Sequence, residues 1–138
     1  MIKEGHRNNM EELEKQSKIF LKERGWDKLR PSDLAKSISI ESAELLELFQ
    51  WCSLTVAETK KDLEKMDHIK SELADVFLYS IYLSITLGFD TEKIILDKLK
   101  KVSLKYPPHL VKKTTGRDPG TEEVYRKIKK SHRAKDNR

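Results

Sequence analysis

The amino-acid sequence predicts an all-α fold. Its 138 residues include only five glycines and four prolines, so few positions interrupt a helix. Apolar side chains recur at helical spacing in several long segments, and no run of alternating β-branched residues indicates a strand. The length corresponds to one domain with a substantial core. We therefore expect four main helices that pack as a bundle-like fold and are completed by oligomerisation.

The first two predicted helices cover residues 9–23 and 33–52. The first is amphipathic, and Gly25 suits its carboxyl end because glycine readily adopts the left-handed conformation found there. Ser32 or Asp33 is expected to cap the second helix, since either side chain can accept a hydrogen bond from a free N–H group of the first turn. The second helix carries apolar residues around most of its circumference and should be largely buried.

Residues 53–67 are polar and rich in lysine, which is typical of either a loop or a short exposed helix. The third main helix is predicted at residues 68–87. Its sequence is apolar on almost every side from Val76 onward, so this half should be buried, and Gly88 should end the helix.

A fourth helix is predicted at residues 91–104, capped by Asp90 or Thr91 and stopped by the prolines at 107 and 108. Its expected core residues are Ile94, Ile95, Leu99 and Val102. A short helix at residues 122–130 follows in the charged C-terminal part.

The charge of the chain is unevenly distributed. The net charge is +5, yet residues 98–138 contain fourteen Lys/Arg and four Asp/Glu, which leaves the first 97 residues with a net charge of −5. We expect a folded domain at residues 1–108 and a basic extension at 109–138. The extension is expected to be solvated or to lie on the acidic body of a neighbouring subunit. Nucleic-acid binding is the less favoured alternative, because few aromatic residues accompany the basic ones.

The chain has a single cysteine, Cys52, which excludes an intrachain disulfide and a cysteine-based zinc site. This usage is compatible with a cytoplasmic protein. We expect neither a signal segment nor a membrane span, because the longest apolar run, residues 76–89, contains polar residues and is too short to cross a bilayer. The four histidines form no pair at helical spacing, and we expect them at the surface.

Three glutamates, Glu41, Glu44 and Glu47, occur three residues apart within the apolar second helix. This spacing stacks their side chains along one side of the helix. A carboxylate on a face that should be packed raises the free energy of the folded state unless a positive charge lies beside it. The pattern recurs in the third helix, where Glu72 and Asp75 form a second carboxylate pair.

If the two helices pack antiparallel, four of these carboxylates converge. Oxygen ligands without histidine favour Mg²⁺, with Mn²⁺ as a substitute, over zinc or a di-iron centre. Magnesium held by carboxylates commonly keeps positions open for phosphate oxygens, which indicates phosphoryl or nucleotidyl chemistry. The alternative is that these carboxylates are solvated or ion-paired positions on exposed helix faces.

The chain resembles the all-α nucleoside triphosphate pyrophosphohydrolases, the MazG-like and dCTP pyrophosphatase group. The resemblance rests on residues 20–26 (FLKERGW), 37–51 ending in ELFQW, 72–79 (ELADVFLY), and Lys98 leading to KYP at 105–107. It implies a homodimer or homotetramer that converts a nucleoside triphosphate and water into the monophosphate and pyrophosphate. It assigns Mg²⁺ binding to a set of four carboxylates: Glu41, Glu44, Glu72 and Asp75.

The resemblance also implies roles for other residues. Glu47 joins the metal site or orients the attacking water, and Lys98 contacts phosphate. Trp26 and Trp51 stack on the base, and Tyr79 touches the sugar. Each of these residues also has a plain structural alternative: a solvated lysine, a packed tyrosine, or a tryptophan in the core or an interface.

Two positions differ from the family pattern. Val102 stands where relatives often have asparagine, so an amide that could read the base or sugar is missing. Arg30 stands where relatives often have histidine, and its guanidinium could serve the triphosphate. Two other functions remain open on the sequence: a non-catalytic module that binds nucleotide or nucleic acid, and a purely structural helical oligomer.

Overall fold

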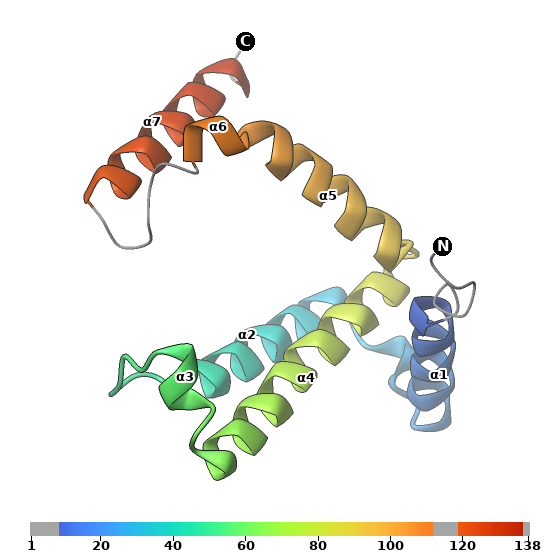
Figure 1. The fold of residues 1–138 in the computed structure, drawn as a ribbon. Coiled ribbons are helices and arrows are strands. Elements are labelled where there is room, and N and C mark those ends of the chain that lie inside the picture. Colours follow the sequence, from blue (N-terminus) through green and yellow to red (C-terminus); the bar gives the residue numbers. More distant parts are fainter. Residues whose placement is uncertain (1–8, 112–118, 137–138) are drawn as a thin grey trace, which may run out of the picture. The chain divides into compact units, whose positions relative to one another are not determined.

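The computed structural model describes residues 9–111 and 119–136, and in that part of the chain every regular element is helical (Figure 1). This confirms the all-α prediction. The elements are α1 (Asn9–Glu23), the 3-10 turn η2 (Trp26–Lys28), α2 (Pro31–Glu47), α3 (Val56–Thr59), α4 (Leu63–Thr86), α5 (Thr91–Lys105), α6 (Pro108–Val111) and α7 (Pro119–Asp136).

The chain divides into two compact units, one ending at Thr91 and the other beginning at Glu92. In the first unit, α2 and α4 lie side by side and run antiparallel, with α3 at the turn between them (Figure 1). A small core joins the two helices to α1: Leu21, Leu34 and Tyr82 are buried together, one from each helix. This core positions α2 against α4 and so determines which of their side chains face one another.

The start and the end of several elements agree with the sequence prediction. The first helix has the predicted limits, 9–23. Gly25 and Gly88 are the two glycines with positive φ in the described part, at 67° and 71°, and each follows the end of a helix. Only glycine adopts this conformation without steric strain, so the two glycines account for the helix ends.

The predicted cap of α2 is wrong. The helix begins at Pro31, and Arg30 is the N-cap residue, with extended backbone and a carbonyl that accepts from the Asp33 N–H. Proline suits the first helical position because its φ is already helical and it lacks the N–H that would be left unbonded there. The helix also ends at Glu47, five residues before the predicted end, in a tight turn where the Phe49 N–H donates to the Leu46 carbonyl.

The connection between α2 and α4 contains the short helix that the sequence left open. In α3 the Thr55 side chain accepts from the Glu58 N–H, and the Glu58 carboxylate accepts from the Thr55 N–H at 2.7 Å. Asp62 then caps α4 by accepting from the Lys65 N–H at 3.0 Å. Because Asp62 supplies this cap, α4 begins at Leu63, five residues before the predicted start.

The prediction that α5 contributes Ile94, Ile95, Leu99 and Val102 to a core is wrong for the single chain, where all four are exposed. The burial predicted for the second half of α4 holds only in part, since Ile81 and Tyr82 are buried but Phe77 is 58% exposed. The final helix, α7, is longer than predicted and spans Pro119–Asp136. Among the described residues no single helix is long and apolar enough to cross a membrane; α4 and α5 meet that criterion only when taken together.

Leu34 is the side chain on which the packing of α2 depends most, because it is 1% exposed and is buried together with Leu21 of α1 and Tyr82 of α4. We expect Leu34→Ala to lower the free energy of unfolding by about 2–4 kcal/mol through lost burial and an unfilled cavity. Chemical denaturation monitored by circular dichroism measures the change. Leu63→Ala, at a position 77% exposed, is the matched control and should change stability far less. An equal loss in the two variants would show that Leu34 is not a core residue.

Candidate active site

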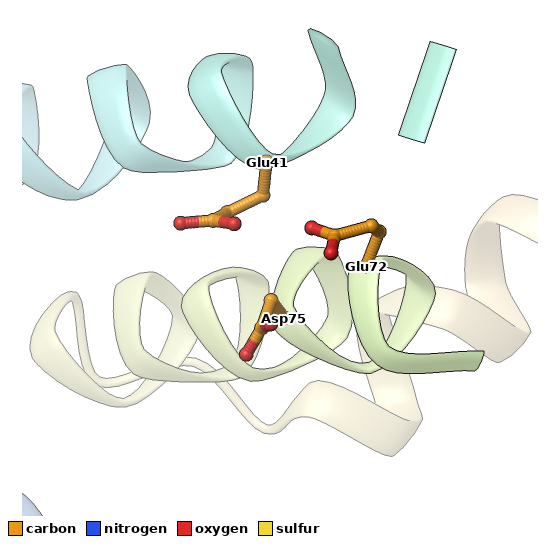
Figure 2. A group of neighbouring side chains, drawn as sticks. All are labelled: Glu41, Glu72 and Asp75. Atoms are coloured by element: carbon orange, nitrogen blue, oxygen red, sulfur yellow. The ribbon is translucent and has the colours of Figure 1, made fainter. Parts of the chain in front are cut away.

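Three carboxylates from two helices meet between α2 and α4. Glu41 extends from α2 toward α4, and Glu72 and Asp75 lie one turn apart on α4 (Figure 2). Carboxylate oxygens of the three residues all lie within 4.8 Å of one another, and each residue is partly buried. Three of the four carboxylates that were predicted to converge therefore do so, because the two helices pack antiparallel; Glu44 is not in the group.

The alignment of the two acidic motifs depends on the α2–α4 connection. Its caps, described above, set where α4 begins. The Lys65 ammonium of α4 donates a hydrogen bond of 3.1 Å to the Cys52 thiol just after α2, and it also lies 5.5 Å from the centre of the Phe49 ring. Sequence analysis did not anticipate this contact, because thirteen residues separate its two partners. The contact fixes one end of the helix pair, while the Leu34 core fixes the other.

The carboxylates repel one another. Partial burial raises the pKa of the Glu41 carboxyl, and the negative charges of Glu44, Asp75 and Glu72 raise it further. In the described part of the chain, none of these four carboxylates forms an ion pair with a lysine or arginine. The arrangement thus concentrates negative charge and lacks a cation of its own, which is the electrostatic condition for binding one.

The donor set agrees with a hard divalent cation. The cluster offers carboxylate oxygens and includes neither histidine nor cysteine. Such ligands favour Mg²⁺ or Mn²⁺ over zinc. Three carboxylates at this spacing are fewer than the six ligands of Mg²⁺, so several positions on a bound ion would be left to water or phosphate oxygens.

Glu44 and Glu47 lie further along α2. Both are exposed, and neither belongs to the group whose oxygens lie within 4.8 Å of one another. Glu44 nevertheless lies near enough to raise the pKa of Glu41. Glu47 is the last residue of α2.

The aromatic residues predicted to contact a base or sugar are distributed over the first unit. Trp26 packs edge-on against Phe20, with 5.9 Å between ring centres, and is half-exposed. Trp51 is 89% exposed, so its ring is left almost uncovered by the described part of the chain. Tyr79 follows Asp75 by one helical turn and contacts Tyr82 edge-on at 5.7 Å.

Two predicted phosphate contacts lie elsewhere on the chain. Arg30 is exposed at the start of α2. Lys98 belongs to the second unit, where it is exposed and lines a cleft with Lys101, Lys105 and His132. The sequence prediction did not include Lys101, Lys105 and His132. The spacing of the lysines could have indicated a shared basic surface, because residues 98, 101 and 105 lie on one face of a helix.

An apolar groove of about 440 Å³ lies between α1 and α4. Leu13, Phe20, Leu78 and Tyr82 contribute to its walls, and the Arg24 guanidinium lies 3.8 Å from the centre of the Phe20 ring. The sequence predicted the apolar face of α1 but not this groove, since its shape depends on how α1 crosses α4.

Together, the helical fold and the carboxylate cluster define a class of all-α protein with a site suited to a divalent cation between antiparallel helices. The MazG-like family model matches residues 36–115, a segment that contains both acidic motifs. The chain belongs to the MazG-like family.

Among solved structures, the chain is similar to a pyrophosphatase from Archaeoglobus fulgidus DSM 4304. The two are 37% identical with a TM-score of 0.64, and the match covers 76% of this chain and 98% of the archaeal one. Among characterised proteins, it is 28% identical to mouse dCTP pyrophosphatase 1 over 103 residues and 27% identical to the human protein of that name over 116 residues. These matches cover 73% and 77% of this chain, and the chain spans 61% and 64% of the length of those relatives.

We expect Glu41→Gln to stabilise the metal-free protein slightly, by less than about 1 kcal/mol, because it removes one of several like charges that are still partly solvated. The sign of the pH dependence follows from the raised pKa of Glu41. The folded state holds the proton of the Glu41 carboxyl more tightly than the unfolded state does. The ionised Glu41 therefore has no destabilising effect below the ordinary glutamate pKa of 4.5, and the effect appears as the pH rises through the raised pKa.

Melting temperatures of the two proteins in EDTA, measured between about pH 4 and about pH 7, test this expectation. The difference between variant and wild type should be small at the acidic end and grow with pH. Added Mg²⁺ should raise the melting temperature of the wild type and raise that of Glu41→Gln much less. A variant that is less stable at every pH, with an unchanged response to Mg²⁺, would contradict the assignment.

Proposed function

We propose that this protein is a Mg²⁺-dependent nucleoside triphosphate pyrophosphohydrolase that releases a nucleoside monophosphate and pyrophosphate. The observation that carries the proposal is the group formed by Glu41, Glu72 and Asp75, three carboxylates without a cationic partner in the described part of the chain. The names of the similar proteins, a pyrophosphatase and dCTP pyrophosphatases, support the reaction class.

The chemistry assigns separate tasks to the residues. Glu41, Glu44, Glu72 and Asp75 would hold Mg²⁺, with Mn²⁺ as a substitute. When bound, the ion supplies positive charge that offsets the charge developing on phosphate oxygens. Glu47 orients the attacking water and accepts its proton as that water adds to the α-phosphorus. Pyrophosphate is then the leaving group.

Substrate contacts come from the remaining residues. Lys98 and Arg30 would bind the triphosphate as cations, and Trp26 and Trp51 would stack on the base, a contact that suits flat aromatic rings. The exposed ring of Trp51 is compatible with this role. Tyr79, one turn from Asp75, would border the sugar. The substrate would be a nucleoside or deoxynucleoside triphosphate, dCTP-like or non-standard, which fits an enzyme that cleans the nucleotide pool. Because Val102 offers no amide to read the base or sugar, we do not expect a strict preference for dCTP.

The domain carrying this activity would be residues 1–108, with 109–138 as a basic extension, and the compartment would be the cytoplasm. If the chain is instead a non-catalytic nucleotide-binding module, it would bind substrate without turnover. The assay below separates these two functions.

The first test is a panel of nucleoside triphosphates with Mg²⁺, assayed for pyrophosphate and for orthophosphate. We expect pyrophosphate, and Glu72→Gln should lower the rate of its release by roughly 100-fold or more, the scale on which loss of one charge contact to a transition state acts. Glu44→Gln should act in the same direction. Orthophosphate in place of pyrophosphate would mean attack at the γ-phosphorus and would refute the proposed reaction.

Glu64→Gln is the control for this experiment, because Glu64 is an exposed carboxylate in the first turn of α4 and lies outside the cluster. It should keep full activity. If binding of a non-hydrolysable triphosphate persists while no member of the panel is turned over by wild type, the binding-module alternative replaces the enzyme.

We also propose that the working form is a homodimer or homotetramer. Few apolar side chains among the described residues are buried, while large ones stay exposed on several helices, including Leu46 on α2, Phe77 on α4 and Leu99 on α5. Exposed apolar surface on this scale is typical of an interface.

Light scattering coupled to size-exclusion chromatography tests the oligomeric state. Wild type should have a mass of two or four chains, whereas Phe77→Asp should shift the population toward the single chain, because a carboxylate in a dry interface loses its hydration. Ser71→Asp, at an exposed position of α4 that six residues turn away from the face of Phe77, is a control for added charge on this helix. A wild-type protein that elutes as a single chain would exclude the oligomer.

A further inference from the structure

The second compact unit contains a positively charged cleft between α5 and α7. Its volume is about 360 Å³. The cleft is lined by Lys98, Lys101, Val102, Leu104 and Lys105 of α5 and by His132 of α7. Helix α7 lies beyond the end of the expected catalytic domain, so the cleft joins a lysine already assigned to phosphate with a residue from the basic extension.

The positions of these residues follow from helix geometry. Lys98, Lys101 and Lys105 are spaced at i, i+3 and i+7, which places them on one face of α5. The rings of Tyr106 and Tyr125 stack in parallel with 5.6 Å between centres and hold α7 beside the end of α5. His132 follows Tyr125 by seven residues, two helical turns, and therefore lies on the same side of α7.

The charge of the cleft is not neutralised within the described residues. Nearby carboxylates already pair with other cations: Asp97 with Lys93, Glu122 with Arg126 and Glu123 with Lys127. None of the three cleft lysines forms an ion pair in this part of the chain; Lys105 lies 5.6 Å from the centre of the Tyr106 ring. Three ammonium groups facing one cleft repel one another, so an anion that bridges them would relieve an unfavourable interaction.

We propose that this cleft binds a di- or triphosphate anion through Lys98, Lys101, Lys105 and His132. Ammonium groups are point charges that suit phosphate oxygens from any direction, and the imidazole adds a directional hydrogen-bond donor. The cleft has room for linked phosphates rather than a single one, and the lysines extend over two helical turns. A nucleic-acid surface is less well matched, because the two tyrosine rings of this region stack on each other.

The inference deepens the proposed function and rests on it for the source of the anion, which is either the triphosphate of the substrate or the pyrophosphate that is released. Binding itself does not require catalysis. The anion can therefore be tested with inorganic pyrophosphate alone, on the full chain and in EDTA, so that no metal at the carboxylate cluster contributes.

Isothermal titration calorimetry with pyrophosphate is the direct measurement. We expect Lys101→Gln and His132→Gln each to weaken binding by about tenfold, the usual scale for loss of one charge-assisted hydrogen bond. Lys100→Gln is the matched control, since Lys100 is exposed on α5 next to Lys101 but does not line the cleft. It should bind within about twofold of wild type, because a screened surface charge acts weakly at this distance. Circular dichroism should show the same melting temperature in all four proteins.

Two further ligands distinguish the sources of the anion. Tighter binding of a non-hydrolysable nucleoside triphosphate than of pyrophosphate, with both weakened by His132→Gln, would assign the cleft to the substrate tail. Equal binding of the two would assign it to the product. Either result supports the site.

Three results would overturn the inference. The first is that pyrophosphate does not bind. The second is that Lys100→Gln weakens pyrophosphate binding as much as Lys101→Gln does, which would mean that the charge acts diffusely. The third is that a nucleic-acid oligomer binds more tightly than pyrophosphate and that all variants weaken its binding alike. Glu72→Gln separates this inference from the proposed function, because it should abolish turnover and leave pyrophosphate binding in EDTA intact. Pyrophosphate binding without any turnover in wild type would uphold the cleft and refute the enzyme.

Discussion

The antiparallel packing of α2 on α4 is the constraint on which the rest of the molecule depends. Apolar contacts around Leu34 and Tyr82 hold the two helices together at one end. At the facing positions further along, the same packing brings Glu41 beside Glu72 and Asp75. The helices would separate if electrostatics alone acted on this region, so the core and the capped connection work against the repulsion. A cation is the natural complement to a site held in this way.

This arrangement illustrates why sites and cores make opposite demands on one helix. Leu34 and Glu41 are seven residues apart and therefore lie on the same side of α2, where Leu34 is buried in the core and Glu41, two turns further on, is only partly buried. Replacing a cluster carboxylate with its amide would ease the repulsion and remove the ligand. The raised pKa of Glu41 is the physical sign of this conflict. It also means that acid would weaken metal binding before it protonates ordinary carboxyl groups.

The second unit differs in character from the first. Its helices carry an excess of lysine and arginine, and among its described acidic residues Asp97, Glu122 and Glu123 each pair with a cation one helical turn away. Such pairs add little to stability because solvent screens them. What distinguishes the unit is that three lysines outside these pairs, Lys98, Lys101 and Lys105, share one face of α5 and line a cleft with His132 of α7. Part of the excess charge therefore has a definite location.

The sequence by itself determined the helical class, the limits of α1, the glycine ends of two helices and the two acidic motifs, because each depends on residues within one or two turns of each other. Tertiary structure alone decided which carboxylates come together. Glu41 lies beside Glu72 and Asp75 of α4, whereas Glu44, which follows Glu41 by the same three residues that separate Glu72 from Asp75, is not in this group. It also decided the Lys65–Cys52 contact and the cleft that includes His132. These features depend on how the helices cross and on the residue at which each helix begins. The starting residue matters because a shift of one residue turns a helical side chain by about 100° around the helix axis. Periodicity predicts that a face exists, but only packing against a neighbouring helix decides what that face meets.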